Sequence, residues 1–392
     1  MIGRRSEQLG TQIFMSIKRL AFLSRVDPND IRGWSGVPYH MMHELKRRFR
    51  EVHGIYPPAV IGRLPRVKLA SKLSQFTGRR FRVGMNKPEL RWRARRISKQ
   101  IESIKPDAIF VAGVDDYVPF LITDLPIIHH SDTTFAAIYG YYPEFENLPD
   151  RIYSLGEYCA RRSIETAAIN IYPSQWAADS ALHDYHADPS TLHVVPYGAN
   201  LNRPPTHEIA TQVRPQGTCK LLLVGGDWKR KRGDIAVGVV EALVEQGIEA
   251  QLSVIGNCPI KHPRVNRYGF LSKGHPKEAK LYSSLWAESH FFILPTKAEC
   301  FGMVFAEAAA WGMPVISCAT GGVPEAVESG VTGELLDVDA PPKAYADRIK
   351  RLWSNEQAYT AMQRAARDRY EHTLNWSAWG NQVELLIRTH LS

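Results

Sequence analysis

The stretch AECFGMVFAEAAAWG (Ala298–Gly312) decides how the C-terminal half of the sequence is interpreted. Gly302 precedes an alanine-rich apolar segment, and two carboxylates, Glu299 and Glu307, stand eight positions apart around it. A buried helix would be expected to lack Glu307, whereas a helix in solvent would be expected to carry more charge. The pattern therefore predicts a largely buried helix, beginning near Phe301 or Gly302, that retains a carboxylate for a function.

The segment before this helix predicts an anion site. HFFILP (residues 290–295) is typical of a buried strand, and the loop that follows leads to the first helical turn. Free N–H groups and the positive dipole end of a helix favour an anion such as phosphate, and Gly302 permits close approach to the backbone. Glu299 and Glu307 can then accept hydrogen bonds from sugar hydroxyls on either side. Alternatively, Glu299 caps the helix and Glu307 ends in solvent.

Strand and helix patterns alternate along the whole chain, which predicts an α/β fold with parallel sheets. At 392 residues the chain exceeds the usual size of one core, so two doubly wound, Rossmann-like domains facing across a cleft are expected. A Pro- and Gly-rich stretch without periodicity, residues 192–218, is the predicted linker. The predicted divisions are residues 1–205, residues 206–375 and a C-terminal helix, 376–392, that could return to the first domain.

Composition favours a cytoplasmic protein. The sequence has no apolar run long enough to span a bilayer, and its first residues, MIGRRSEQLGTQIFMSIKRL, lack the apolar core of a signal peptide. Five cysteines without a CxxC spacing argue against a disulfide framework or a zinc site. These features predict a reducing compartment.

Positive charge is concentrated at the N-terminal end. Residues 1–110 hold 24 Lys and Arg against 8 Asp and Glu, a net charge of +16, whereas the whole chain carries +9 and the remainder about −7. Such a region would suit phosphorylated ligands or peripheral contact with an anionic membrane, or it is simply a set of solvated helix faces. No nucleic-acid-binding module is recognisable, so nucleic acid is not an expected partner.

Five segments in order carry a resemblance to a known family. Residues 297–337 resemble the E-x7-E segment of family 4 retaining glycosyltransferases of the GT-B fold, and the stretches VVPYGAN (194–200), LLLVGGDWKRKRGDIAV (221–237), SVIG (253–256) and YGFLSK (268–273) resemble other landmarks of that family. The resemblance is strong over roughly residues 165–340 and mostly architectural before them. It implies a C-terminal domain that binds a nucleotide-sugar donor and an N-terminal domain on the acceptor side.

The resemblance also implies individual roles. Glu299 would hydrogen-bond the transferred sugar, Glu307 the nucleotide ribose, and the segment from Tyr268 to Leu271 would lie near the base. The donor diphosphate would meet the backbone amides of Phe301, Gly302, Met303 and Val304.

The sequence departs from the family pattern at the two expected cations of the phosphate site. Gly226 occupies the first position and Arg232 the second, within the basic loop DWKRKRG. Arg232 is the favoured contact for the diphosphate and Lys231 its substitute, although the loop is also compatible with a solvated basic turn.

Two N-terminal segments supply further candidates. RGWSGVPYHM (residues 32–41) resembles the family's glycine loop, which predicts that Gly33, Ser35 and Gly36 approach donor phosphate and acceptor. IIHHSDTTF (residues 127–135) lies where related enzymes place a histidine near the reacting sugar, so His129, His130 and Asp132 are candidates. Strand alternation allows only one of the two histidines to face the cleft.

The predicted activity is transfer of a sugar from a nucleotide-diphosphate sugar to an acceptor hydroxyl, with retention at the anomeric carbon. The resemblance implies front-face attack with the leaving phosphate taking the acceptor proton, and it leaves the acceptor (glycan, lipid-linked or small molecule) open. No cofactor or metal is expected, since the sequence DVD (residues 337–339) is predicted to be a loop and Asp115–Asp116 a helix cap. A nucleotide-sugar 2-epimerase and a non-catalytic sugar-nucleotide-binding protein remain alternatives.

Overall fold

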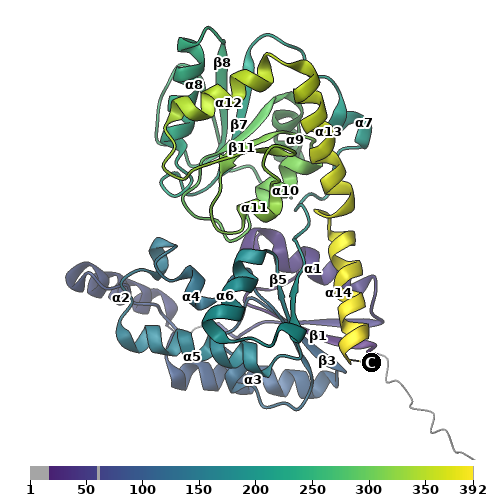
Figure 1. Ribbon diagram of the computed structural model, residues 1–392. Coiled ribbons are helices and arrows are strands. Elements are labelled where there is room, and N and C mark those ends of the chain that lie inside the picture. The colour runs from purple at the N-terminus through teal and green to yellow at the C-terminus, as the bar shows by residue number, and fades with distance from the viewer. Residues whose placement is uncertain (1–16, 60–61, 392) are drawn as a thin grey trace, which may run out of the picture.

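The structure, a computed structural model, describes residues 17–59 and 62–391. The prediction that the first residues do not form a signal peptide concerns mainly residues 1–16, and that part of it lies outside the described residues. The described chain forms two α/β domains, one above the other in Figure 1.

The N-terminal domain is built on a parallel sheet of six strands in the order β2-β1-β3-β4-β5-β6. The central strands read as short apolar runs because both faces of the sheet are covered. The strands are β1 (Arg19–Ser24), β2 (Glu51–Ile55), β3 (Ala108–Ala112), β4 (Ile127–His130), β5 (Ile169–Tyr172) and β6 (Leu192–Val194).

The C-terminal domain repeats this design with six parallel strands in the order β12-β11-β10-β7-β8-β9. These strands are β7 (Cys219–Gly225), β8 (Ala250–Gly256), β9 (Val265–Gly269), β10 (Phe291–Leu294), β11 (Val315–Cys318) and β12 (Gly333–Leu336). The two sheets confirm the predicted GT-B architecture of paired Rossmann-like domains.

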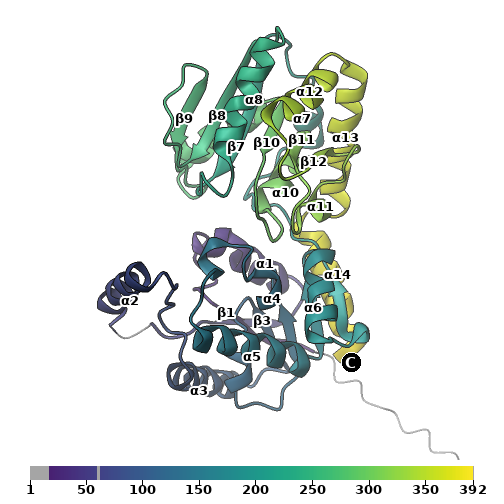
Figure 2. The same cartoon turned by 60° about the vertical axis from the view of Figure 1, so that its left-hand side comes forward.

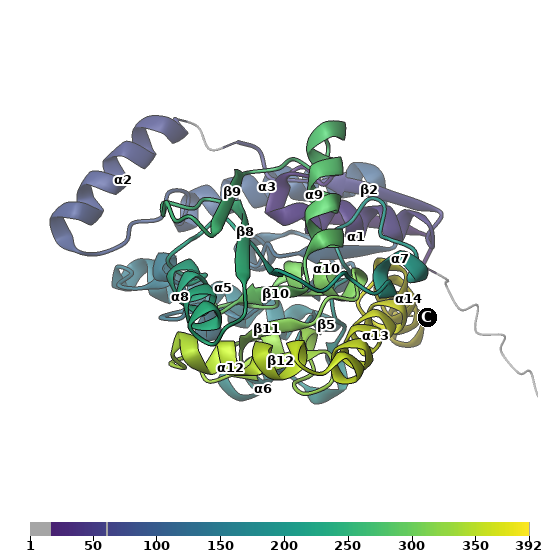
Figure 3. The ribbon, with the colours of Figure 1, turned by 90° about the horizontal axis from the view of Figure 1, so that it is seen from above.

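Helices cover both sheets (Figures 1 and 3). The N-terminal domain has α1 (Val37–Lys46), α2 (Arg63–Thr77), α3 (Lys87–Ile104), α4 (Phe135–Ile138), α5 (Asp150–Thr166) and α6 (Gln175–Tyr185). The rest of the described chain adds α7 (His207–Thr211), α8 (Gly233–Glu245), α9 (Pro276–Glu288), α10 (Met303–Ala310), α11 (Val323–Ala326), α12 (Pro342–Trp353), α13 (Glu356–His372) and α14 (Trp376–Leu391). Within the described residues, none of these helices combines the length and apolarity needed to cross a membrane.

The predicted linker, residues 192–218, is more structured than its composition indicated. Its first residues form β6, which pairs with β5 from Asn170 to Tyr172, and α7 follows with Thr206 as its N-cap. Strand pairing and a side-chain cap impose order on this stretch that local periodicity does not reveal.

Helix α14 joins the two domains. It follows α13 of the C-terminal domain and packs on α1 of the N-terminal domain, where Arg48 donates to the carbonyl of Ser377 at 2.9 Å (Figures 1 and 2). Trp376 at its start donates to Asn200 Oδ1 at 3.0 Å, in the segment that leads from one domain to the other. The C-terminal helix therefore ties the hinge region to the N-terminal sheet.

Each sheet has one point at which the strand order reverses direction. In the N-terminal sheet this switch point lies between β1 and β3, and in the C-terminal sheet it lies between β7 and β10. Ligands of doubly wound sheets bind at the carboxyl ends of the strands near such points. The loops that follow these four strands are therefore the places to look for a site.

Candidate active site

The loops after β7 and β10 bring one carboxylate and two cations together. Glu299, from the loop after β10, accepts from Arg230 Nη1 at 2.9 Å and from Lys231 Nζ, both in the loop after β7. Glu299 and Lys231 are buried, with 6% and 8% of their surface exposed. Arg230 also donates to the Ala298 carbonyl at 2.5 Å, which fixes one loop against the other.

This cluster keeps Glu299 ionised. Burial alone would raise the pKa of the carboxyl, but the adjacent Lys231 and Arg230 outweigh it, so the pKa of Glu299 lies below its ordinary value. A charged, buried carboxylate with cations on one side can still accept hydrogen bonds from a ligand hydroxyl on the other.

Helix α10 begins directly after this loop, as predicted. Gly302 is its N-cap in a left-handed conformation (φ 82°), and a Cβ at this position would lie 2.5 Å from the Phe305 ring. Among the described residues, no side chain caps the helix at Gly302. Phe301 is buried against the Tyr197 ring, whereas Met303 and Val304 are half-buried. The first turn of α10 therefore offers backbone donors beside Glu299.

Glu307 has its own, separate partners. Within α10 it is 2% exposed, and its two oxygens accept from Lys273 Nζ and the Tyr282 hydroxyl. Lys273 also donates to the Asn200 carbonyl at 3.0 Å, between the two domains. The alternative that Glu307 merely ends in solvent is wrong, because Lys273 and Tyr282 compensate its burial.

Arg232, the favoured contact for the diphosphate, has a backbone partner outside the Glu299 cluster. This residue is the N-cap of α8 with φ 51°, and its guanidinium donates to the Val338 carbonyl and not to Glu299. The left-handed backbone at Arg232 reverses the chain there, so Lys231 and Arg230 are the loop cations that contact Glu299. Gly226 lies beside the exposed Phe270 ring, and Leu271 is half-buried against the core.

Two tyrosines of the N-terminal domain hold the Glu299 loop from the opposite side. The Tyr141 hydroxyl accepts from the N–H of Glu299 at 3.0 Å, and the Tyr142 hydroxyl accepts from the N–H of Cys300 at 3.1 Å. Arg230 lies over the Tyr142 ring at 4.9 Å. The segment after α4 thus positions a C-terminal loop across the domain boundary.

Replacing Tyr142 with Phe is expected to lower the free energy of unfolding by about 1–2 kcal/mol, because the buried N–H of Cys300 loses its acceptor. Urea denaturation measures this change, and donor titration is expected to show weaker binding as the Glu299 loop loosens. Tyr139→Phe, at a side chain that is 40% exposed, is the matched control. Equal stability of the two variants would contradict the assignment.

A cavity of about 270 Å³ lies at the switch point of the N-terminal sheet. It is lined by residues that follow β1, β3 and β4, among them Arg25, Asp115 and Asp132, and by Arg82 from the chain after α2. Burial, reinforced by Asp115, raises the pKa of Asp132 to about 6. Such a cavity with convergent charged groups is a candidate ligand site.

The predicted glycine loop borders this cavity. Residues Gly33–Gly36 form one turn of 3-10 helix in which Trp34 and Ser35 have positive φ angles of 45° and 55°. The Trp34 ring lines the cavity and packs on Gly113, where a Cβ would lie 2.6 Å from it. The Ser35 carbonyl accepts from Asn200 Nδ2 at 2.6 Å. Two consecutive left-handed residues are the kind of strain that clusters at functional sites.

The two histidines of β4 point to opposite sides of the sheet, and both are buried. His129 Nε2 lies 3.0 Å from Asp115 Oδ1 and its Nδ1 2.9 Å from Asn170 Oδ1. His130 accepts from Trp379 Nε1 at 3.2 Å, and burial lowers its pKa to about 3. Neither side chain lines the described cavity, so the expectation that one of them faces the cleft between the domains stays a prediction. Both are buried because β4 is a central strand covered on both faces.

Asp115 and Asp116 do not cap a helix, so that interpretation is wrong. Asp115 pairs with His129, and Asp116 pairs with Arg25 at 2.9 Å. Burial opposes protonation of His129, but Asp115 outweighs it, so the pKa of His129 is raised above 6.5. His129 therefore acts on the cavity through Asp115.

Replacing Asp115 with Asn is expected to lower the pKa of His129, as measured by NMR titration of the imidazole. The raised pKa means that the pair contributes stability that is fully present below about pH 6.5 and is lost as the pH rises through the folded-state pKa. Wild type and variant should therefore differ most in unfolding free energy at low pH. Asp124→Asn, at an exposed carboxylate, is the control, and an unchanged His129 titration in Asp115→Asn would contradict the pairing.

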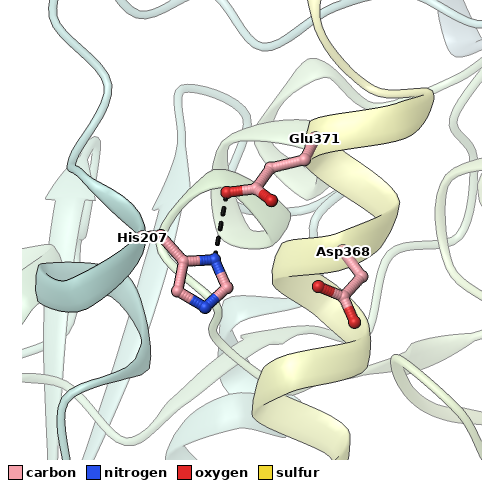
Figure 4. Close-up of side chains that lie close together, drawn as sticks. All are labelled: His207, Asp368 and Glu371. Carbon is pink, nitrogen blue, oxygen red and sulfur yellow. Dashed lines mark hydrogen bonds and ion pairs between the residues drawn. The ribbon is translucent and has the colours of Figure 1, made fainter.

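Figure 4 shows one further group of side chains with metal-ligand chemistry, His207, Asp368 and Glu371, on α7 and α13. His207 Nδ1 lies 3.1 Å from Glu371 Oε1, and the same oxygen accepts from Arg367 Nε at 2.8 Å. All three side chains are exposed, and the arginine already neutralises the shared carboxylate. We assign no metal to this group.

Several site residues were not predicted from the sequence. Lys273 closes the landmark YGFLSK, which assigned it no role, and Tyr282, Tyr141 and Tyr142 lie outside the motifs. For Tyr141 and Tyr142 the visible signal was the tyrosine-rich run IYGYYPEF, residues 138–145, since aromatic residues with polar tips often bridge buried surfaces.

Comparison with known proteins gives matches to glycosyltransferases. Residues 212–355 match the family model described as glycosyl transferases group 1. The chain is 27% identical over 293 residues to a D-inositol 3-phosphate glycosyltransferase of Corynebacterium glutamicum, covering 69% of this chain and 68% of that protein.

Solved structures share the whole architecture at low identity. Sucrose-phosphate synthase from Thermosynechococcus elongatus superimposes with a TM-score of 0.67 at 18% identity, covering 95% of this chain and 98% of that one. Anabaena Alr3699/HepE, in complex with UDP and glucose, gives 0.63 at 15% identity, covering 95% and 99%. The solved structures thus share the GT-B fold of this chain, and the sequence matches are to glycosyltransferases. Residues 212–355 are similar to the group 1 glycosyl transferases, in agreement with the resemblance to family 4.

Proposed function

We propose that the protein is a retaining, metal-independent glycosyltransferase that moves a sugar from a nucleotide-diphosphate sugar to an acceptor hydroxyl. The observation that carries this proposal is the meeting of Glu299, Lys231 and Arg230 beside the open start of α10, at the switch point between β7 and β10. Positive side chains and helix amides are the groups that stabilise a departing diphosphate.

The donor would be held in three parts. The backbone N–H groups of Gly302, Met303 and Val304 would bind the diphosphate together with Lys231, and Glu307 would bind the ribose. Glu299 would accept a hydrogen bond from the transferred sugar while Arg230 keeps it in place. Negative charge that grows on the leaving phosphate is then met by preorganised donors, so little reorganisation is needed at the moment of transfer. Since Lys231 and Arg230 supply positive charge there, neither a metal nor a cofactor is invoked.

The acceptor would enter the N-terminal cavity. Asp115 and Asp132 can accept hydrogen bonds from hydroxyl groups, and the Arg82 guanidinium can meet an anionic substituent. A phosphorylated cyclitol, the class named for the corynebacterial relative, has both kinds of group, and a glycan or lipid-linked acceptor with an anionic group would meet the same chemistry. In this arrangement His129 is a positioning residue for Asp115, and no role in transfer is retained for His130.

The cysteines and the basic N-terminal half bear on the compartment in which the protein would act. The five cysteines are free thiols, and four of them are buried, which suits a reducing compartment such as the cytoplasm. The basic N-terminal half, with a net charge of +16 over residues 1–110, would hold the protein at the surface of an anionic membrane. Nucleic acid is not proposed as a partner.

A donor panel tests the function. UDP-, GDP- and ADP-sugars are first ranked by thermal shift, because a ligand that binds the folded state raises its apparent stability. The best donor is then incubated with and without inositol phosphates and glycan acceptors, and NMR gives the anomeric configuration of the product. Retention with transfer supports the proposal. Inverted product would overturn retention, 2-epimerised sugar without acceptor would indicate an epimerase, and binding without turnover would indicate a non-catalytic protein.

A further inference from the structure

Helix α2 stands apart from the body of the N-terminal domain in all three views (Figures 1–3). Its large apolar side chains are exposed to an unusual degree, including Leu64 at 78%, Leu69 at 59% and Phe76 at 91%. Leu69, Leu73 and Phe76 follow each other at helical spacing, so they form one apolar stripe along α2. An exposed stripe of this kind on a projecting helix indicates a surface that is covered in function.

The charge around the stripe indicates what covers it. Residues 63–80 contain six Lys and Arg and no Asp or Glu. Lys68 and Lys72 are exposed, whereas Arg66 and Arg79 pair with Glu89 and Asp150 of the domain body. A basic helix with leucine and phenylalanine on its surface has the composition of helices that lie in a lipid–water interface. A second copy of α2 would bring like charges together, and a nucleic acid would not need the apolar stripe.

The chain after α2 leads straight to the N-terminal cavity. Phe81 N–H donates to Ser74 Oγ at 3.1 Å, and Arg80 N–H donates to the Asn147 carbonyl at 2.9 Å, which ties this return segment to α2 and to the domain. Arg82 and Met85, only a few residues on, line the cavity. A lipid surface that covers α2 would therefore lie beside the proposed acceptor cavity.

We propose that α2 is an interfacial helix that docks the protein on an anionic lipid membrane, with Leu69, Leu73 and Phe76 among the acyl boundary and Lys68 and Lys72 at the headgroups. This inference deepens the proposed function by assigning the membrane contact to α2. It rests on the proposed function only for the reason why docking is useful, not for the docking itself. Burial of the three side chains supplies affinity, and each lysine near an anionic surface adds an attraction that salt weakens.

Vesicle sedimentation of the full chain tests the proposal. Phosphatidylcholine vesicles with and without phosphatidylglycerol are compared at low and high salt. Wild type is expected to sediment with the anionic vesicles at low salt and to dissociate as salt increases. Leu69→Ser/Leu73→Ser/Phe76→Ser is expected to bind at least about tenfold more weakly, since each change removes apolar surface from the lipid contact. Lys68→Gln/Lys72→Gln is expected to bind more weakly and with less dependence on salt.

The matched control is Val331→Ser/Leu385→Ser, at two exposed apolar side chains outside α2. It should sediment like wild type, and all variants should keep the melting temperature and the donor hydrolysis rate of wild type. Equal sedimentation of the triple variant and wild type, indifference to anionic lipid, or binding of an oligonucleotide in place of vesicles would overturn the proposal. Vesicle binding by a chain that cleaves no nucleotide sugar would leave the docking intact and remove the enzymatic function, so the two failures are distinguishable.

Discussion

Glu299→Gln is expected to reduce turnover of the nucleotide-sugar donor by at least about a hundredfold. The amide keeps the size of the side chain but removes the charge that faces Lys231 and Arg230 and weakens the acceptor for a sugar hydroxyl. The loss should appear in kcat more than in KM, because the interaction is proposed to strengthen as charge separates in the transition state. Steady-state kinetics with the donor selected by thermal shift measures both constants.

Loss of the buried negative charge also carries a stability cost. It leaves Lys231 without its counter-charge, which is expected to lower the free energy of unfolding by about 3 kcal/mol. Activity is therefore measured well below the melting temperature of the variant. Glu288→Gln, at an exposed glutamate that pairs with Lys220, is the control and should behave as wild type. A folded Glu299→Gln variant with wild-type turnover would contradict the assigned role.

Lys231→Met is expected to slow cleavage of the donor by roughly a hundredfold to a thousandfold, as expected when a preorganised positive group near the leaving phosphate is lost. Methionine fills much of the space of the lysine stem, so the change tests the charge. Single-turnover donor cleavage isolates this step from product release.

Arg232→Met is the matched comparison, because the two cations are adjacent in sequence but differ in direction. Arg232 donates to the Val338 carbonyl, so its replacement should change donor cleavage by less than about tenfold. If Arg232→Met slowed donor cleavage more than Lys231→Met, the sequence-based prediction that Arg232 contacts the diphosphate would hold. That result would contradict the role assigned to Lys231 from the geometry of the loop.

Much of the fold follows from local sequence pattern. Runs such as PDAIFVAG and HFFILP predict buried parallel strands because both faces of such strands meet apolar neighbours. Serine is a preferred N-cap, and the Ser174 hydroxyl at the start of α6 accepts from the N–H of Ala177 at 3.4 Å. The start of α10 was equally visible, since a glycine before an alanine-rich segment is a local signal. These elements depend on neighbours in sequence.

The site partners depend on contacts between distant segments. Lys273 and Glu307 meet across 34 positions, and Tyr142 reaches the Cys300 amide across 158. A short strand such as β2, and β6 inside the predicted linker, exists because a neighbouring strand supplies hydrogen bonds. The direction of the Arg232 side chain depends on one left-handed backbone angle. Because of it, Lys231 and not Arg232, the cation that the family pattern favoured, contacts Glu299. No periodicity in the sequence encodes these choices.

A crystal structure of the protein with its nucleotide-diphosphate sugar tests the central claim most directly. The diphosphate is expected within hydrogen-bonding distance of the backbone N–H groups of Gly302 to Val304 and of Lys231 Nζ, with the sugar hydroxyls at Glu299 and the ribose at Glu307. A donor bound elsewhere, with the first turn of α10 free of phosphate, would contradict the account.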